Sequence, residues 1–138
     1  MSTILELSKI CAERNPHPAD QRKRIVALLT AGADVNAGDK NGVTALHHAV
    51  RFRSPGAVGA LIEHSANVNQ ACRKSGSTPL HRAVTSTGAP GTAGKHKEAV
   101  EIIRLLIAAG ADLSLTNKSG KKPADYVKDD AVKSCLTR

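Results

Sequence analysis

The stretches TALHHAV at residues 44–50 and TPLHRAV at residues 78–84 are two copies of one pattern. A glycine stands two positions before each copy, and these glycines, Gly42 and Gly76, are 34 residues apart. A related stretch follows Gly120, which is 44 residues beyond Gly76. A recurrence near 33 residues indicates a repeat protein, in which each unit buries its apolar face by stacking on its neighbours.

Each unit begins with a tight turn and a short helix. The Asn-Gly and Ser-Gly pairs at residues 41–42, 75–76 and 119–120 predict turns in which glycine takes a positive φ. Thr44 and Thr78 directly precede Ala/Leu-rich stretches, where a hydroxyl can accept a hydrogen bond from the first helical turn. These residues therefore predict helix starts at two equivalent positions.

A longer helix follows in each unit. In AVEIIRLLIAAG, residues 99–110, apolar side chains recur at spacings of three and four, which is typical of an amphipathic helix. Gly110, and Gly32 in the first unit, fit helix C-termini.

These motifs, together with GADVN at residues 32–36, resemble ankyrin repeats over nearly the whole chain. The resemblance implies an all-α solenoid of stacked helix-turn-helix units linked by β-turn loops. Lys122 replaces the capping threonine in the last unit, so we expect a less regular first helix there. The initiating Met and the two atypical end units lead us to expect a complete protein. The single domain, residues 1–138, divides into an N-terminal cap repeat (1–36), a repeat (37–69), a repeat with an insertion (70–113, insertion 87–97) and a C-terminal cap repeat (114–138).

The resemblance also implies a function: a non-catalytic module or scaffold that binds a partner protein through its concave face, made of turn tips and the outward sides of the short helices. Basic residues recur there in every unit, so we expect an acidic partner surface. Phe52, the only Phe, is either a binding hot spot beside Arg51 and Arg53 or a plug against residues 54–58. The expected partner-binding residues are Lys40, Asn41, Val43, Arg51, Phe52, Lys74, Ser75, Ser77, Arg82, Thr85, Ser86, Lys118, Ser119 and Lys121.

The net charge of +8 and the pI near 9.8 also permit an anionic partner of another kind. A nucleic-acid-associated protein is one alternative, disfavoured because the chain has one Phe, one Tyr, no Trp and no nucleic-acid-binding signature. An obligate subunit of a fixed complex, including a homodimer through the surroundings of Cys72, is the other. We expect a monomer.

The insertion contains GAPGTAGKHKE, residues 88–98, whose spacing is close to that of a phosphate-binding P-loop. His96 stands where a P-loop needs Ser or Thr, and the stretch falls between two predicted helices instead of after a strand. Nucleotide hydrolysis is therefore rejected. Two interpretations remain: an anion contact by Lys95, His96 and Lys97, or a surface loop that tolerates insertion.

Metal binding and catalysis find no support. His47 and His48 are adjacent and the three cysteines form no C-x-x-C pair, so we expect no metal and no cofactor. The ankyrin resemblance implies that His47 and His81 fix neighbouring turns. The sequence has no recognisable local arrangement of a nucleophile beside a general base and an orienting group, so we expect no enzyme. Free cysteines and the absence of a signal peptide or apolar span predict a cytoplasmic location, with the nucleus also open and no membrane partner.

Overall fold

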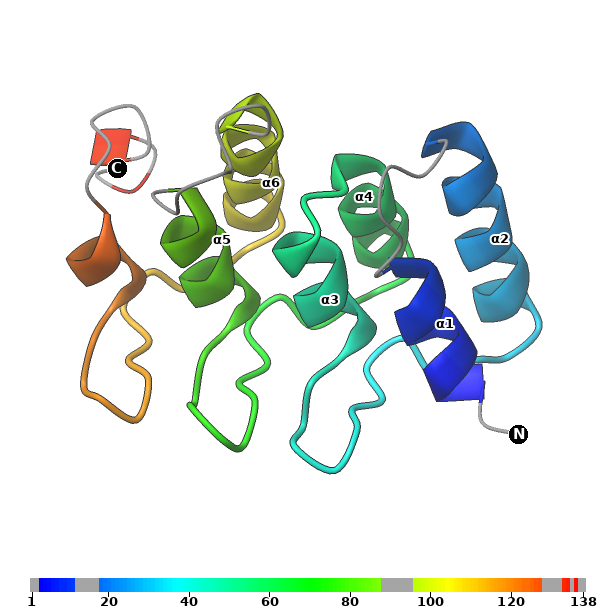
Figure 1. The fold of residues 1–138 in the computed structure, drawn as a ribbon, viewed down its shortest axis with the longest axis horizontal. Coiled ribbons are helices and arrows are strands. Elements are labelled where there is room, and N and C mark those ends of the chain that lie inside the picture. Colours follow the sequence, from blue (N-terminus) through cyan, green and yellow to red (C-terminus); the bar gives the residue numbers. More distant parts are fainter. Residues whose placement is uncertain (1–2, 12–17, 88–95, 128–132, 135, 137–138) are drawn as a thin grey trace.

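The computed structural model is an all-α stack of helix pairs with loops projecting along one edge (Figure 1). It describes residues 3–11, 18–87, 96–127, 133–134 and 136. The all-α class is confirmed, because the described residues contain helices and only one isolated β-bridge, between Gly38 and Thr44. The elements are α1 (Thr3–Cys11), α2 (Pro18–Thr30), α3 (Ala45–Arg51), α4 (Pro55–Glu63), α5 (Pro79–Thr87), α6 (His96–Ala108) and the 3₁₀ helix η2 (Pro123–Tyr126).

The helices form two rows. Helices α1, α3, α5 and η2 pack side by side in an inner row, and α2, α4 and α6 pack in an outer row behind it. Each inner helix also packs on the outer helix of its own unit, as α3 does on α4 and α5 on α6. The core between the rows is aliphatic: Leu46, Leu61, Leu80, Ile103 and Leu106 are at most 1% exposed. Stacking thus supplies the burial that a single unit lacks.

The predicted cap at Thr44 is confirmed. The Thr44 hydroxyl accepts a hydrogen bond from the His47 N–H (3.4 Å), and the Thr44 N–H donates to His47 Nδ1 (3.1 Å). Thr78 and His81 repeat this reciprocal arrangement at the start of α5. Two N–H groups that a helix start leaves unpaired are satisfied in this way at each site.

Asparagines join the loops that follow the outer helices. The Asn36 side chain accepts from the Asn67 N–H (2.6 Å) and donates to the Ser65 carbonyl (3.3 Å). Asn69 does the same in the next unit, with the Asp112 N–H (2.7 Å) and Gly110 carbonyl (3.3 Å). These bonds set the register of one unit on the next.

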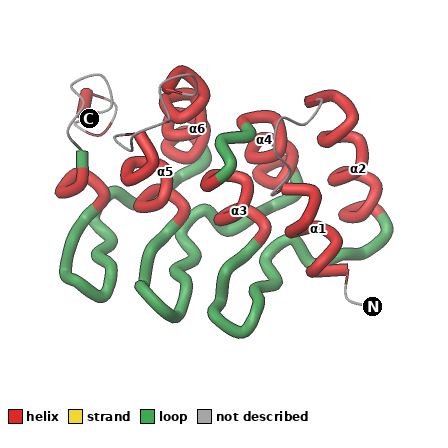
Figure 2. The backbone as a smooth tube through the Cα atoms, viewed as in Figure 1, coloured by secondary structure: helices red, strands yellow, loops and turns green. Residues whose placement is uncertain are grey.

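The projecting loops, green in Figure 2, are three tight turns that lie side by side. We call them finger 1 (residues 38–43), finger 2 (72–77) and finger 3 (116–121). Each turns at a glycine with positive φ, for example Gly76 at 70°, as predicted. The expected irregular first helix of the last unit is also found, since η2 is a four-residue 3₁₀ helix.

Helices α5 and α6 extend into the expected insertion (residues 87–97) at its two ends. Thr87 is the last residue of α5, and His96 and Lys97 are the first residues of α6, so these three belong to helices. The rest of the insertion lies outside the described residues. The segment follows a helix, which agrees with the rejection of a P-loop. No helix in the described part of the chain is both long and apolar enough to cross a membrane.

Candidate partner-binding site

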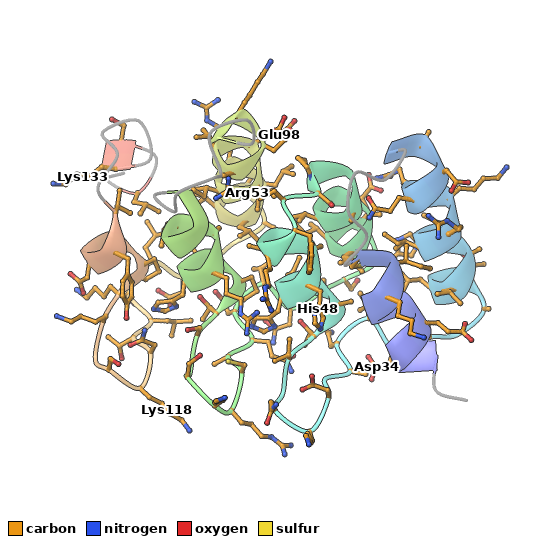
Figure 3. The ribbon with its side chains drawn as sticks, in the orientation of Figure 1. Asp34, His48, Arg53, Glu98, Lys118 and Lys133 are labelled. Atoms are coloured by element: carbon orange, nitrogen blue, oxygen red, sulfur yellow. The ribbon has the colours of Figure 1, made fainter. Side chains whose placement is uncertain are left out.

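The three fingers present one lysine each at the same place. Lys40, Lys74 and Lys118 occupy equivalent positions, two residues before the turn glycine, and all three are exposed. Lys118 lies at the tip of finger 3 (Figure 3). The next residue of each finger, Asn41, Ser75 or Ser119, is also exposed. Six of the expected partner-binding residues therefore form a single row along the edge of the stack.

Backbone hydrogen bonds hold neighbouring fingertips together. The Arg73 N–H donates to the Asn41 carbonyl (2.7 Å), and the Lys118 N–H donates to the Ser75 carbonyl (2.9 Å). The backbones are so close that a Cβ on Gly76 would lie 2.9 Å from the Lys118 nitrogen. The three lysines are consequently carried by one connected structure with a fixed spacing.

A side chain at the base of fingers 1 and 3 shapes the turn. Asp39 accepts from the N–H groups of Asn41 (2.8 Å) and Val43 (3.1 Å), and Asn117 accepts from those of Ser119 (3.0 Å) and Lys121 (3.1 Å). Slight desolvation of this exposed carboxylate opposes the shift, but the two backbone N–H groups lower the pKa of Asp39, which stays ionised.

Finger 2 has hydroxyl and thiol groups in place of the Asp39 carboxylate or the Asn117 amide. The Ser75 hydroxyl accepts from the Ser77 N–H (3.3 Å), donates to the Ser77 hydroxyl (3.0 Å) and lies 3.1 Å from Cys72 Sγ. Burial would raise the pKa of Cys72, but hydrogen bonds from Ser75, Ser77 and Arg82 lower it to about 7.

Two buried histidines connect the inner helices to the next finger. The ring Nδ1 of each accepts from its capping threonine, so Nε2 carries the hydrogen. Nε2 of His47 donates to the Ser77 carbonyl (3.1 Å), and Nε2 of His81 donates to the Lys121 carbonyl (2.9 Å). Burial lowers the pKa of His47 to about 4. The structural role that the ankyrin resemblance implied for both histidines is confirmed.

A pocket of about 470 Å³ opens between fingers 2 and 3. The backbone contact between Lys118 and Ser75 closes one side of this junction, and the rings of Tyr126 and His81 form a T-shaped pair with their centroids 6.4 Å apart. Five of the lining residues were expected partner-binding residues. The lining consists of Lys74, Ser75, Ser77, His81, Asn117, Lys118, Ser119 and Tyr126.

The other expected residues lie elsewhere on the inner row. Arg51 ends α3 and Phe52 follows it, at the opposite end of that helix from the fingers. Phe52 is half-buried, with the Arg51 guanidinium 5.8 Å from the ring centroid, which is within cation–π range. Thr85 and Ser86 lie near the same end of α5. The expected set is thus divided between the finger row and the far ends of the inner helices.

Arg82, Val43 and Lys121 lie between these two groups. Arg82 is half-buried on α5; burial first, and then the Arg82 guanidinium, lower the pKa of His48 on α3. Val43 is half-buried and Lys121 exposed at the ends of their fingers. Among the insertion residues, Lys97 is exposed on the first turn of α6, which His96 begins, and Lys95 lies outside the described residues.

Sequence reasoning missed Asn117 and Tyr126 as members of the site. Asn117 is aligned with Asp39 when the turn glycines are superposed, so its role in the finger was available from the repeat register. Tyr126 gave no such signal, because the corresponding residues of the earlier units are His48 and Arg82. Only the packing of η2 on α5 brings Tyr126 to the pocket.

The described site residues offer positive charge and hydrogen-bonding groups to a partner. Within the described residues, no group of three or more His, Cys, Asp or Glu side chains is placed to hold a metal ion. Both nitrogens of the pocket histidine, His81, are occupied by structural hydrogen bonds.

Comparison with known proteins agrees with this architecture. The family model described as ankyrin repeats (3 copies) matches residues 17–117. The chain therefore belongs to the ankyrin-repeat family, whose members are non-enzymatic domains that mediate protein–protein interaction.

Several curated proteins and solved structures are similar to this chain. It is 34% identical to human BCL-6 corepressor-like protein 1 over 113 residues (82% of this chain, 6% of that protein) and 36% identical to human B-cell lymphoma 3 protein over 100 residues (70% and 20%). The crystal structure of the ankyrin repeat domain of Bcl-3 has a TM-score of 0.73 and 31% identity, covering 87% of this chain and 48% of that one. The chain thus spans only a fraction of the length of these relatives.

Proposed function

We propose that this ankyrin-repeat domain binds an acidic segment of a partner protein along its finger row. The observation that carries the proposal is the repeated exposed lysine: Lys40, Lys74 and Lys118 stand at one position of three connected fingers. A partner segment that follows the row would meet a cation at every finger. Such a regular array favours encounter with an acidic segment and disfavours basic competitors.

The positive charge of the finger row differs from one end to the other. Finger 1 carries the exposed, ionised Asp39, which offsets Lys40 in part. The corresponding residues in fingers 2 and 3 are Arg73 and Asn117. We therefore expect fingers 2 and 3 to make the larger electrostatic contribution to binding.

The test compares two charge-reversed variants that have the same net charge. One variant is Lys40→Glu/Lys74→Glu/Lys118→Glu; the control is Lys23→Glu/Lys97→Glu/Arg104→Glu, which reverses three exposed cations on outer helices α2 and α6. Because all six side chains are exposed, we expect both variants to fold, as circular dichroism and thermal unfolding will verify.

Each variant and the wild type are used to capture proteins from a nuclease-treated extract at physiological salt. A partner retained by the wild type and the control, and lost from the finger variant, supports the proposal. Equal recovery by the wild type and both variants contradicts it and directs attention to Arg51 and Phe52, or to residues 95–97. Tight binding of a duplex oligonucleotide that falls steeply with salt would instead favour the nucleic-acid alternative.

A further inference from the structure

The pocket between fingers 2 and 3 is strongly cationic for its size. Lys74 comes from one wall and Lys118 from the other, and none of its described lining residues is acidic. Its volume of about 470 Å³ falls within the range of small-ligand sites, so it can take a whole charged side chain. A negatively charged group would complement this lining.

Hydroxyl groups add hydrogen-bond donors on both walls. The Ser77 hydroxyl accepts from Ser75, and the Tyr126 hydroxyl accepts from the Asn117 side-chain amide (2.7 Å). Because a hydroxyl can accept and donate at the same time, both can still donate to a ligand. The pocket accordingly offers hydrogens from two directions, with a lysine on each side.

The equivalent junction between fingers 1 and 2 also has two lysines, Lys40 and Lys74, but it lacks the two hydroxyls. Superposing the turn glycines places Val43 opposite Ser77, Arg73 opposite Asn117 and Arg82 opposite Tyr126. Val43 has no hydroxyl, and the Arg73 stem packs where a Cβ on Gly42 would lie, 3.2 Å away. Finger 1 also contributes the ionised Asp39. Two lysines stand at the equivalent positions of both junctions, but the hydroxyls of Ser77 and Tyr126 are particular to the junction of fingers 2 and 3.

We propose that this pocket holds the phosphate of a phosphoserine or phosphothreonine in the partner's acidic segment. The inference rests on the proposed function and adds to it. A phosphate monoester carries a charge near −2 and three terminal oxygens, which suits two lysines and donors on opposite walls. A carboxylate has one charge and two oxygens in a plane, so it can satisfy only part of this lining.

The test measures binding of three synthetic peptides that share Glu-Glu-X-Glu-Glu, with X as phosphoserine, Glu or Ser, by nuclear magnetic resonance titration at physiological salt. We expect the phosphoserine peptide to bind about tenfold more tightly than the Glu peptide, and to shift the amides of residues 74–77 and 117–121.

Variants separate specific phosphate recognition from general charge. Ser77→Val introduces the residue found at the equivalent position of finger 1, and Tyr126→Phe removes one hydroxyl; neither changes the net charge. Both should reduce the phosphoserine preference at least threefold, whereas binding of the Glu peptide stays the same. Lys118→Ala should weaken the phosphoserine peptide about tenfold, and the control Lys97→Ala, which removes an exposed lysine on the outer helix α6, less than twofold.

The two proposals fail in different ways. Equal affinity for the phosphoserine and Glu peptides, both weakened by charge reversal in the fingers, overturns the phosphate site and leaves the acidic-segment proposal intact. Phosphoserine binding that survives both Ser77→Val and Lys118→Ala places the phosphate elsewhere and also overturns the site. Absence of binding by any of the peptides at millimolar concentration counts against both proposals.

Discussion

Acidification should lower the folding stability of this protein because of one buried histidine, His47. His47 is 0% exposed and neutral, with Nε2 donating to the Ser77 carbonyl and Nδ1 accepting from the Thr44 N–H. Protonation at Nδ1 would turn that acceptor into a donor facing another donor. Burial, which disfavours the charged ring, lowers the pKa of His47 from 6.5 to about 4.

The size and sign of the effect follow from proton binding. Below pH 6.5 the unfolded chain protonates at residue 47 while the folded protein does not, so the unfolded state binds more protons. The stability from neutral His47 is complete above pH 6.5 and is lost as the pH falls to about 4. Each unit of the difference between the two pKa values corresponds to about 1.36 kcal/mol, so the free energy of unfolding falls by about 3 kcal/mol. Domains of this size are stabilised by only about 5–15 kcal/mol, so the loss is large.

The assay is urea unfolding followed by circular dichroism at several pH values between about 4 and 7. At pH near 5, the free energy of unfolding should change by close to 1.4 kcal/mol for each pH unit because of His47 alone. His47→Gln should lower that slope by nearly the whole amount. The control is His48→Gln on the same helix; burial and then Arg82 lower the pKa of half-buried His48 by less, so the slope should change less. Identical slopes for the wild type and His47→Gln would refute the reasoning.

Three further outcomes are expected from urea unfolding at neutral pH. Gly120→Ala should cost about 1 kcal/mol, because φ is 73° with nothing within 4 Å of the new Cβ, and Gly76→Ala should cost more, because its Cβ would lie 2.9 Å from the Lys118 nitrogen; equal costs would contradict this contact. Thr44→Ala should destabilise by about 1 kcal/mol through loss of the cap, whereas Thr44→Ser, which keeps the hydroxyl, should cost less; a neutral Thr44→Ala would show that the cap contributes nothing. Leu106→Ala should cost about 2–5 kcal/mol because Leu106 is 0% exposed between the rows, and a cost under 1 kcal/mol would mean that the core relaxes around the cavity.

Much of the architecture could be predicted because the repeat encodes it locally. A capping Thr, a turn glycine and apolar residues at helical spacing act within a few residues of themselves, so the pattern indicates the helices and turns. The irregular last unit was predictable for the same reason, since Lys122 cannot supply the hydroxyl that Thr44 supplies. The helix ends at residues 87 and 96 were not predictable, because an alignment of repeats does not show how far a helix extends into extra residues.

The candidate site was predicted only in part. Periodicity placed Lys40, Lys74 and Lys118 in equivalent positions, and the structure brings them into one row. It does not bring Arg51 and Phe52 to that row, because α3 carries them to its far end. Sequence spacing shows which position of a repeat a residue occupies. It does not show which ends of the stacked helices lie on the same side of the protein.

The sequence by itself determined the ankyrin-repeat class, the helix starts, the turn glycines and the basic character of the fingers, since each depends on neighbouring residues. Only the tertiary structure decided that Ser77 and Tyr126, which belong to successive units, line one pocket with Lys74 and Lys118. The physical reason is that η2 packs on α5 through contacts distant in the chain, and the Lys118 N–H is bonded to the Ser75 carbonyl. Such contacts depend on how successive units stack, and the sequence of a single repeat does not specify this stacking.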